Sequence, residues 1–247
     1  MTLSLAVTFV AWLLAGIIGI VTGMGGPLLS LTIMFFFVDL QTIIVTACVV
    51  GFFSSLPLVW RFWRSIDWRR NWLLFFGSLP GVLAGVMALK LVPIFWMELA
   101  IGVLLVAFSV WQAWAGGKGG GPALKETNAV LLACGAASGF FSGAVGLGGP
   151  PVAVCAYKCR WDKDMARGLF GSFFALSLVA AVVLDIGHGL ITPDAWKHIF
   201  AAMPGMVLGT LAGLPLAARL PQELFRRLML LVVFCGGLSL LFKAFFM

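Results

Sequence analysis

Apolar runs follow one another along almost the whole chain, and polar residues gather in the short segments between them. The runs cover residues 3–22, 28–38, 41–60, 72–92, 94–114, 128–145, 150–157, 168–188, 196–217 and 224–246. A helix needs ~20 mostly apolar residues to cross the hydrocarbon core of a bilayer, and most of these runs are about that long. The pattern therefore predicts an all-α polytopic membrane protein.

The composition excludes a soluble enzyme. Hydrophobic residues fill 62% of the 247 positions, charged residues fill 10%, and the mean hydropathy is +1.11, whereas a soluble domain carries ~25% charged residues. The short segments between the runs leave no room for a separate catalytic or nucleotide-binding domain. We therefore expect no enzymatic activity, no cofactor and no metal. Packing is favoured over metal binding for Cys155 and Cys159, because the chain holds only two histidines as further ligands.

A glycine-rich motif occurs twice at the spacing of a duplication. The sequence Gly-Met-Gly-Gly-Pro at 23–27 recurs as Gly-Leu-Gly-Gly-Pro at 146–150, 123 residues later, and the Pro-Gly pair at 80–81 recurs at 204–205, 124 residues later. A stretch rich in glycine near the middle of the chain is typical of a flexible linker. These features predict a first transmembrane repeat over residues 1–115, a linker over 116–127 and a second repeat over 128–247.

The 16 Lys and Arg residues indicate how the repeats are oriented. If each broken segment (3–38 and 128–157) crosses once, the positive charges divide evenly between the two sides. If each segment instead returns to its own side, Lys90, Lys197 and Lys243 lie opposite all the others, namely Arg61, Arg64, Arg69, Arg70, Lys118, Lys125, Lys158, Arg160, Lys163, Arg167, Arg219, Arg226 and Arg227.

The positive-inside rule favours the second arrangement. It predicts two inverted repeats, each with a Gly/Pro-broken helical hairpin plus about three transmembrane helices, and places both termini outside. Whether the hairpins are re-entrant or fully crossing stays open. The same rule explains the net charge of +7, so we expect no binding to nucleic acid.

The two glycine-rich breaks are the candidate binding site. Relative to alanine, glycine costs ~1 kcal/mol and proline ~3 kcal/mol in a helix interior, but proline suits the first turn of a new helix. Each break therefore predicts a helix N-terminus, whose N–H groups and dipole attract anions. Paired Gly/Pro-interrupted segments also point to the binding site of a transporter.

The candidate binding residues are those of the breaks and the hydroxyls beside them: Thr22, Gly23, Gly25, Gly26, Pro27, Ser142, Gly146, Gly148, Gly149 and Pro150. We expect that Gly26 and Gly149, which precede the prolines, tolerate no side chain. Close helix packing is the favoured interpretation of the other repeated glycines, which are Gly16, Gly19, Gly81, Gly85, Gly139, Gly205 and Gly209.

The sequence gives little indication of proton coupling. Asp185 and His188 fall at the outer end of an apolar run, and no Asp or Glu falls clearly in the middle of one. A carboxylate relay of the kind found in many transporters is therefore not expected.

The twin breaks, the Asp-Trp pair at 67–68 and the Pro-Gly-x-x-x-Gly helix at 80–85 make the chain resemble the TauE/SafE sulfite-exporter family. The resemblance places the family motif on Gly23, Gly25, Gly26 and Pro27, and on Gly146, Gly148, Gly149 and Pro150. It implies a multi-pass inner-membrane transporter of sulfite, thiosulfate or an organosulfonate such as sulfoacetate, with export as the favoured direction. An anion channel and a carrier of non-sulfur organic anions are the alternatives. The expected partners are the anion and the lipid bilayer, and a homodimer stays open.

The charge distribution generates a topology prediction. Cysteines introduced at Lys118 and Lys163 should both react only with a reagent that reaches the cytoplasmic side, because a hairpin that returns to its own side lies between them. Labelling of intact and permeabilised cells with a membrane-impermeant maleimide measures this. Labelling of one position from outside and of the other from inside would contradict the inverted arrangement.

Overall fold

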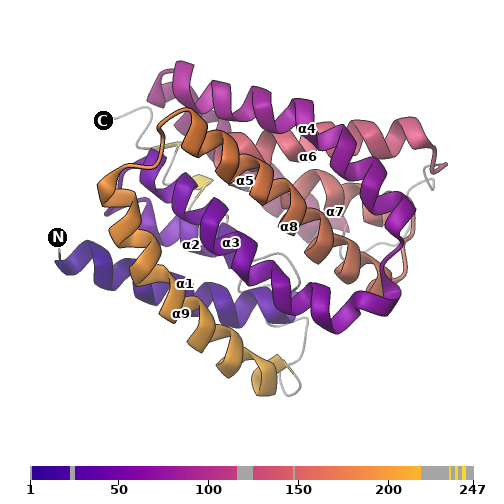
Figure 1. Ribbon diagram of the computed structural model, residues 1–247, viewed down its shortest axis with the longest axis horizontal. Helices are drawn as coiled ribbons and strands as arrows, with labels where there is room; N and C mark the ends of the chain where they lie inside the picture. The colour runs from indigo at the N-terminus through magenta and orange to yellow at the C-terminus, as the bar shows by residue number, and fades with distance from the viewer. Residues whose placement is uncertain are drawn as a thin grey trace.

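The computed structural model describes residues 2–22, 26–115, 125–146 and 148–217, together with 234, 237–238 and 241–242. Its elements are the helices α1 (Thr2–Thr22), α2 (Gly26–Met34), α3 (Leu40–Phe62), α4 (Trp68–Leu91), α5 (Ile94–Ala115), α6 (Asn128–Val145), α7 (Gly149–Lys158), α8 (Lys163–Gly187) and α9 (Pro193–Ala217), with a 3₁₀ turn at Trp63–Ser65 (Figure 1). Most of the predicted linker and of the last apolar run lies outside the described residues.

The helices confirm the predicted class of a polytopic all-α membrane protein. Five of them, α1, α3, α4, α8 and α9, are long and apolar enough to cross a membrane. The described residues contain no β-strand. Each helix lies within a few residues of the apolar run that predicted it, because prolines, glycines and capping residues fix where the helices end.

Aspartates cap three of these helices. The side chain of Asp39 accepts a hydrogen bond from the Thr42 N–H at 2.8 Å, and Asp162 caps α8 in the same way. These two caps are 123 residues apart, like the glycine motifs. Asp67 caps α4. Such a cap contributes ~1 kcal/mol by satisfying an N–H group that has no partner inside the helix.

Glycine faces hold four helices in pairs. Glycines on α4 lie against the backbone of α6, and glycines on α6 lie against the backbone of α4. A Cβ atom on Gly139, for example, would overlap the carbonyl oxygen of Ser78. The pair α1–α9 packs in the same way, since a Cβ on Gly16 would lie 2.5 Å from the Met206 oxygen. These contacts confirm the packing interpretation for Gly16, Gly81, Gly85, Gly139, Gly205 and Gly209. A Cβ on Gly19 would make only ordinary van der Waals contacts, so close packing does not require a glycine there.

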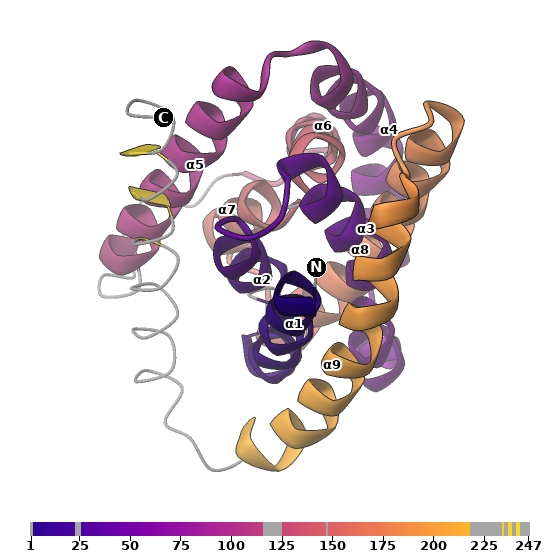
Figure 2. The same ribbon diagram turned by 90° about the vertical axis from the view of Figure 1, so that its left-hand side faces the viewer.

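The pairs α4–α6 and α1–α9 flank a central pair, α3 and α8 (Figure 1). Figure 2 shows α2 and α7 between this central pair and α5. Each helix of the first half has a counterpart in the second half: α1 corresponds to α6, α3 to α8 and α4 to α9. The α1–α9 contact therefore corresponds to the α6–α4 contact, and the α3–α8 contact corresponds to itself. The duplicated segments therefore make equivalent contacts in the folded chain.

Each broken pair of helices begins and ends at the same end of the bundle. Residues flanking α6 and α7 meet where the Trp161 Nε1 donates to Glu126 at 2.7 Å, and Arg70 pairs with the same carboxylate. At the opposite end, Thr8 near the start of α1 lies 2.8 Å from the His198 ring, and Gln41 near the start of α3 donates to the Leu190 oxygen at 3.0 Å.

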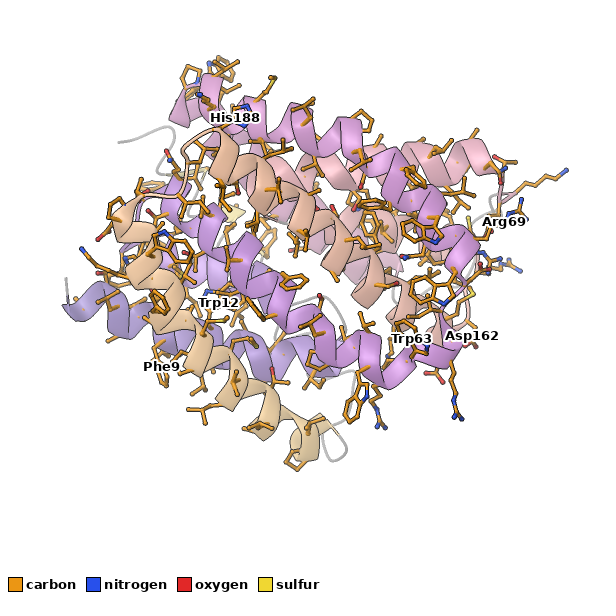
Figure 3. All side chains as sticks on the ribbon, viewed as in Figure 1. Phe9, Trp12, Trp63, Arg69, Asp162 and His188 are labelled. Atoms are coloured by element: carbon orange, nitrogen blue, oxygen red, sulfur yellow. The ribbon has the colours of Figure 1, made fainter. Side chains whose placement is uncertain are left out.

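Figure 3 shows the two ends, with Trp63, Arg69 and Asp162 at one and His188 at the other. The two broken pairs thus enter the bundle from opposite ends. This is the contact pattern expected of hairpins that return to their own side. The sidedness of the chain and the inverted relation of the repeats stay predictions.

Candidate functional site

The second break lies where α6 ends at Gly146 and α7 begins at Gly149. Gly146 has φ +70° and ψ 16°, a left-handed conformation that glycine adopts without a steric penalty. Its N–H donates to the Ser142 oxygen at 3.0 Å and so closes the last turn of α6. Pro150 lies in the first turn of α7. The predicted helix break and the predicted position of the proline are confirmed.

Two serines of α6 face the second break. The Ser138 hydroxyl donates to the Gly148 oxygen. Ser142 is fully buried, its Oγ has no hydrogen-bond partner among the described residues, and a Cβ on Gly148 would overlap that Oγ. A buried polar group without a partner costs ~1–3 kcal/mol. An unsatisfied hydroxyl therefore lies directly beside the chain that enters the N-terminus of α7.

Residues 44–48 of α3 lie beside the second break. A Cβ on Gly146 would lie 2.9 Å from the Ala47 side chain and 3.3 Å from the Ile44 oxygen. The Cys48 thiol donates to the Ser142 oxygen at 3.7 Å. The hydroxyl of Thr46, on the same stretch of α3, is buried without a partner in the described part of the chain.

The first break packs against α1 and α3. Gly26 begins α2 and is buried, and Pro27 follows in the first turn, as predicted. The hydroxyl of Ser30 donates to the Pro27 oxygen at 3.0 Å. A Cβ on Gly19 of α1 would lie 3.8 Å from the Gly26 Cα and 3.7 Å from the Ser54 hydroxyl of α3. α3 thus contacts the surroundings of both breaks.

Some predicted site residues lie wholly or partly outside the part of the chain that the structure describes. Gly23, Gly25 and the side chains of Thr22 and Pro150 lie outside the described residues. For Gly26 the structure gives a more immediate reason to exclude a side chain than approach to a ligand, because a Cβ would lie 2.6 Å from the Ala15 oxygen. Gly26 therefore also serves as a packing residue.

The two breaks lie close to each other along α3. The second contacts Ala47 and the first approaches Ser54. Seven residues of helix separate these positions, which corresponds to about 10 Å at a rise of 1.5 Å per residue. Residues beside both breaks, Gly19 at the first and Gly146 at the second, therefore contact the same helix, α3.

The described Lys and Arg side chains lie at the ends of the bundle. Arg61 and Arg64, which follow the third apolar run, are exposed. Arg167 lies over the Phe62 ring, and Arg70 pairs with Asp67 and Glu126. The polar groups that line the described part of the breaks are neutral backbone and hydroxyl groups. An anion held there would bind to neutral donors.

Sequence reasoning missed one buried acid. Asp185 has 1% of its surface exposed, and neither of its carboxyl oxygens has a hydrogen-bond partner among the described residues. The sequence placed it at the outer end of an apolar run and gave it little weight. A signal was present, since it is the only acid in the run from 168 to 188.

The contact between Gly148 and Ser142 generates a stability prediction. Gly148→Ala should lower the stability of the protein by ~1–3 kcal/mol, because the added methyl group would overlap the Ser142 hydroxyl. Ser142→Ala alone should raise the stability or leave it unchanged, because it removes a buried hydroxyl that has no partner among the described residues. It should also restore most of the stability of Gly148→Ala. Thermal unfolding in detergent measures all three variants.

Gly187→Ala is the matched control, because no atom of the described residues lies within 4 Å of the position of its Cβ. It should leave the stability unchanged or raise it slightly. Additive effects of Gly148→Ala and Ser142→Ala would contradict the contact between these two residues.

Comparison with known proteins identifies the family. Residues 8–240, nearly the whole chain, match the model of the family described as sulfite exporter TauE/SafE. No curated protein and no solved structure matches the chain. The members of the family are membrane transporters and not enzymes, which confirms both expectations from the sequence. With its two broken helix pairs and its apolar helices, this chain belongs to the sulfite exporter TauE/SafE family.

Proposed function

We propose that this protein carries a small sulfur oxyanion such as sulfite, thiosulfate or sulfoacetate, and that the anion binds at the helix breaks. The family implies membrane transport of sulfur anions such as sulfite. The observation that carries the binding site is the buried Ser142 hydroxyl beside Gly148, at the start of α7, which has no hydrogen-bond partner in the part of the chain that the structure describes. A bound anion would supply the missing hydrogen-bond acceptor.

Neutral donors suit this anion. The N-terminus of a helix carries roughly half a positive charge and presents free N–H groups. Binding by such groups does not require a buried lysine or arginine, and the described cations lie at the ends of the bundle. A tetrahedral or pyramidal sulfur oxyanion offers three or more oxygens to donors that converge from several directions. A planar carboxylate offers only two.

The packing supports a mechanism in which two groups of helices, each containing a helix from both repeats, move around the breaks. The pairs α1–α9 and α4–α6 are held by close backbone contacts, so each is suited to move as a unit. The broken pairs enter from opposite ends of the bundle, as two inverted repeats would. Alternating access in transporters with inverted repeats is largely a rocking of one part against another around a fixed site. Export across the inner membrane is the direction that we propose from the family description.

Binding of a matched pair of anions tests the function. Sulfoacetate should bind ~10-fold or more tightly than malonate, because a donor left unpaired in a dry site costs ~1–3 kcal/mol and 1.4 kcal/mol is a factor of ten. Ser142→Ala should weaken sulfoacetate binding ~3- to 10-fold, the effect of one hydrogen bond. Titration calorimetry in detergent measures both.

Ser109→Ala is the matched control, because Ser109 is also buried but its hydroxyl already donates to the Leu105 oxygen of its own helix. It should leave sulfoacetate affinity unchanged. Equal affinities for sulfoacetate and malonate would refute binding at the helix breaks. Saturable uptake into proteoliposomes, rather than a conductance that rises linearly with concentration, separates a carrier from a channel.

A further inference from the structure

The buried carboxyl of Asp185 has no role in the anion site described above. Asp185 lies in α8, a helix long and apolar enough to span the membrane, and both carboxyl oxygens lack partners in the described part of the chain. An unpaired carboxylate in a low-dielectric interior is costly, so such a group is neutralised by a proton or paired. Ionisable residues inside membrane helices commonly mark ion or proton pathways.

Contacts between α3 and α8 place Asp185 level with the second break. A Cβ on Gly51 would lie 3.1 Å from the Leu178 side chain, and Gln41 donates to the Leu190 oxygen at 3.0 Å. These contacts show that α3 and α8 are antiparallel. Asp185 falls between the two contact points, level with residues 44–46 of α3. The same stretch of α3 packs against Gly146 at the second break.

Few charged groups lie near this carboxyl. Cys48 on α3 and His188 on α8 interact with it electrostatically. The Nδ1 of His188 lies 2.8 Å from the Leu184 oxygen. None of the ion pairs among the described residues includes Asp185.

The other helices around α8 place no further charge at this level. Ser172 of α8 donates to Asn71 of α4 at 3.0 Å, and the two helices run in the same direction (Figure 1). Residues 83–85 of α4, which are all uncharged, are therefore level with Asp185. Lys90 lies beyond them and is exposed. Residues 128–145 of α6 include no charged residue. The other Lys, Arg and Cys residues of the elements packed on α8 lie toward its N-terminal half: Arg61, Arg64, Arg69, Arg70, Cys134, Cys155 and Lys158.

We propose that Asp185 binds a proton that is transported together with the anion. This proposal rests on the proposed function. The second break and Asp185 both lie beside residues 44–48 of α3. An anion at the break and an ionised Asp185 would therefore repel each other in a medium of low dielectric constant. Anion binding therefore favours the protonated carboxyl, and by linkage a proton on Asp185 favours anion binding. During export the proton joins the carboxylate from cytoplasmic water and leaves it to water outside. A dianion that carries one proton moves one net negative charge outward, which a membrane potential that is negative inside favours.

Wild-type protein in proteoliposomes gives the first test. Thiosulfate is a suitable probe because it stays a dianion near neutral pH. With the membrane potential clamped at zero, an acidic exterior should drive thiosulfate accumulation up to ~10-fold for each unit of pH gradient, because one coupled proton contributes 1.36 kcal/mol per unit. Without an initial gradient, thiosulfate influx should acidify the lumen, as reported by a trapped pH dye.

Variants assign the coupling to Asp185. Asp185→Asn resembles the protonated side chain, so it should retain exchange of labelled for unlabelled thiosulfate but lose accumulation driven by pH. Asp185→Glu should keep part of that accumulation. Asp164→Asn is the matched control, because Asp164 lies in the first turn of the same helix with 61% of its side chain exposed. This variant should behave like wild type.

The outcomes separate the two proposals. Absence of thiosulfate exchange by the wild type, together with absence of sulfoacetate binding, would refute the proposed function. Exchange by the wild type without any response to the pH gradient would overturn proton coupling alone. Accumulation driven by pH that survives in Asp185→Asn would show that another group binds the proton. Loss of all exchange in both Asp185→Asn and Asp185→Glu, with normal membrane insertion, would contradict the proposed role as well.

Discussion

A broken helix persists inside a membrane only where protein surrounds the break, because lipid offers no hydrogen-bond partner to exposed N–H and C=O groups. The rest of this structure follows from that constraint. The helices that lead into the two breaks, α1 and α6, are each held along a glycine face against a helix of the other half, α9 and α4. The backbone contacts position the breaks against α3, and the returning helices α2 and α7 remain within the bundle (Figure 2).

The same constraint shapes the chemistry of the proposed site. Enclosing the breaks in protein leaves neutral donors at helix N-termini and a buried hydroxyl at Ser142. A site of this kind holds an anion through geometry more than through net charge. No cation of the described residues lies near it to offset further negative charge, so an acid close to it must be neutral when the anion is bound. Asp185 fits that requirement only if it takes up a proton. Selectivity for the anion and its coupling to a proton would then share one cause, which is the absence of buried positive charge among the described residues.

Much of the fold could be predicted from the sequence, because its signals are local. Glycine and proline at 146–150 end one helix and begin the next whatever surrounds them, and the aspartate at position 39 begins α3 by capping its own backbone. The glycine spacing also predicted close packing. It could not predict the partner, since Gly139 meets Ser78 of α4, a residue 61 positions away in the chain.

The properties of single site residues were less predictable, because they depend on which helices meet. Ser142 and Ser138 lie on the same helix, but one hydroxyl is satisfied by Gly148 and the other is not. The position of Asp185 near the end of an apolar run gave no indication that it is buried, and the antiparallel packing of α8 on α3 buries it. Gly26 was predicted to approach a ligand, and its nearest neighbour is the Ala15 carbonyl. These outcomes require knowledge of contacts between distant segments.

The most direct measurement of the central claim observes the glycine amides at the second break. In protein labelled with nitrogen-15 glycine, with the Gly148 and Gly149 signals assigned by substitution, titration with thiosulfate should shift these two amide resonances in a saturable way. Glycines of the packing faces, such as Gly81 and Gly139, should respond little. Saturable shifts at other glycines, with Gly148 and Gly149 unchanged, would show that the anion binds elsewhere and would contradict binding at the helix breaks.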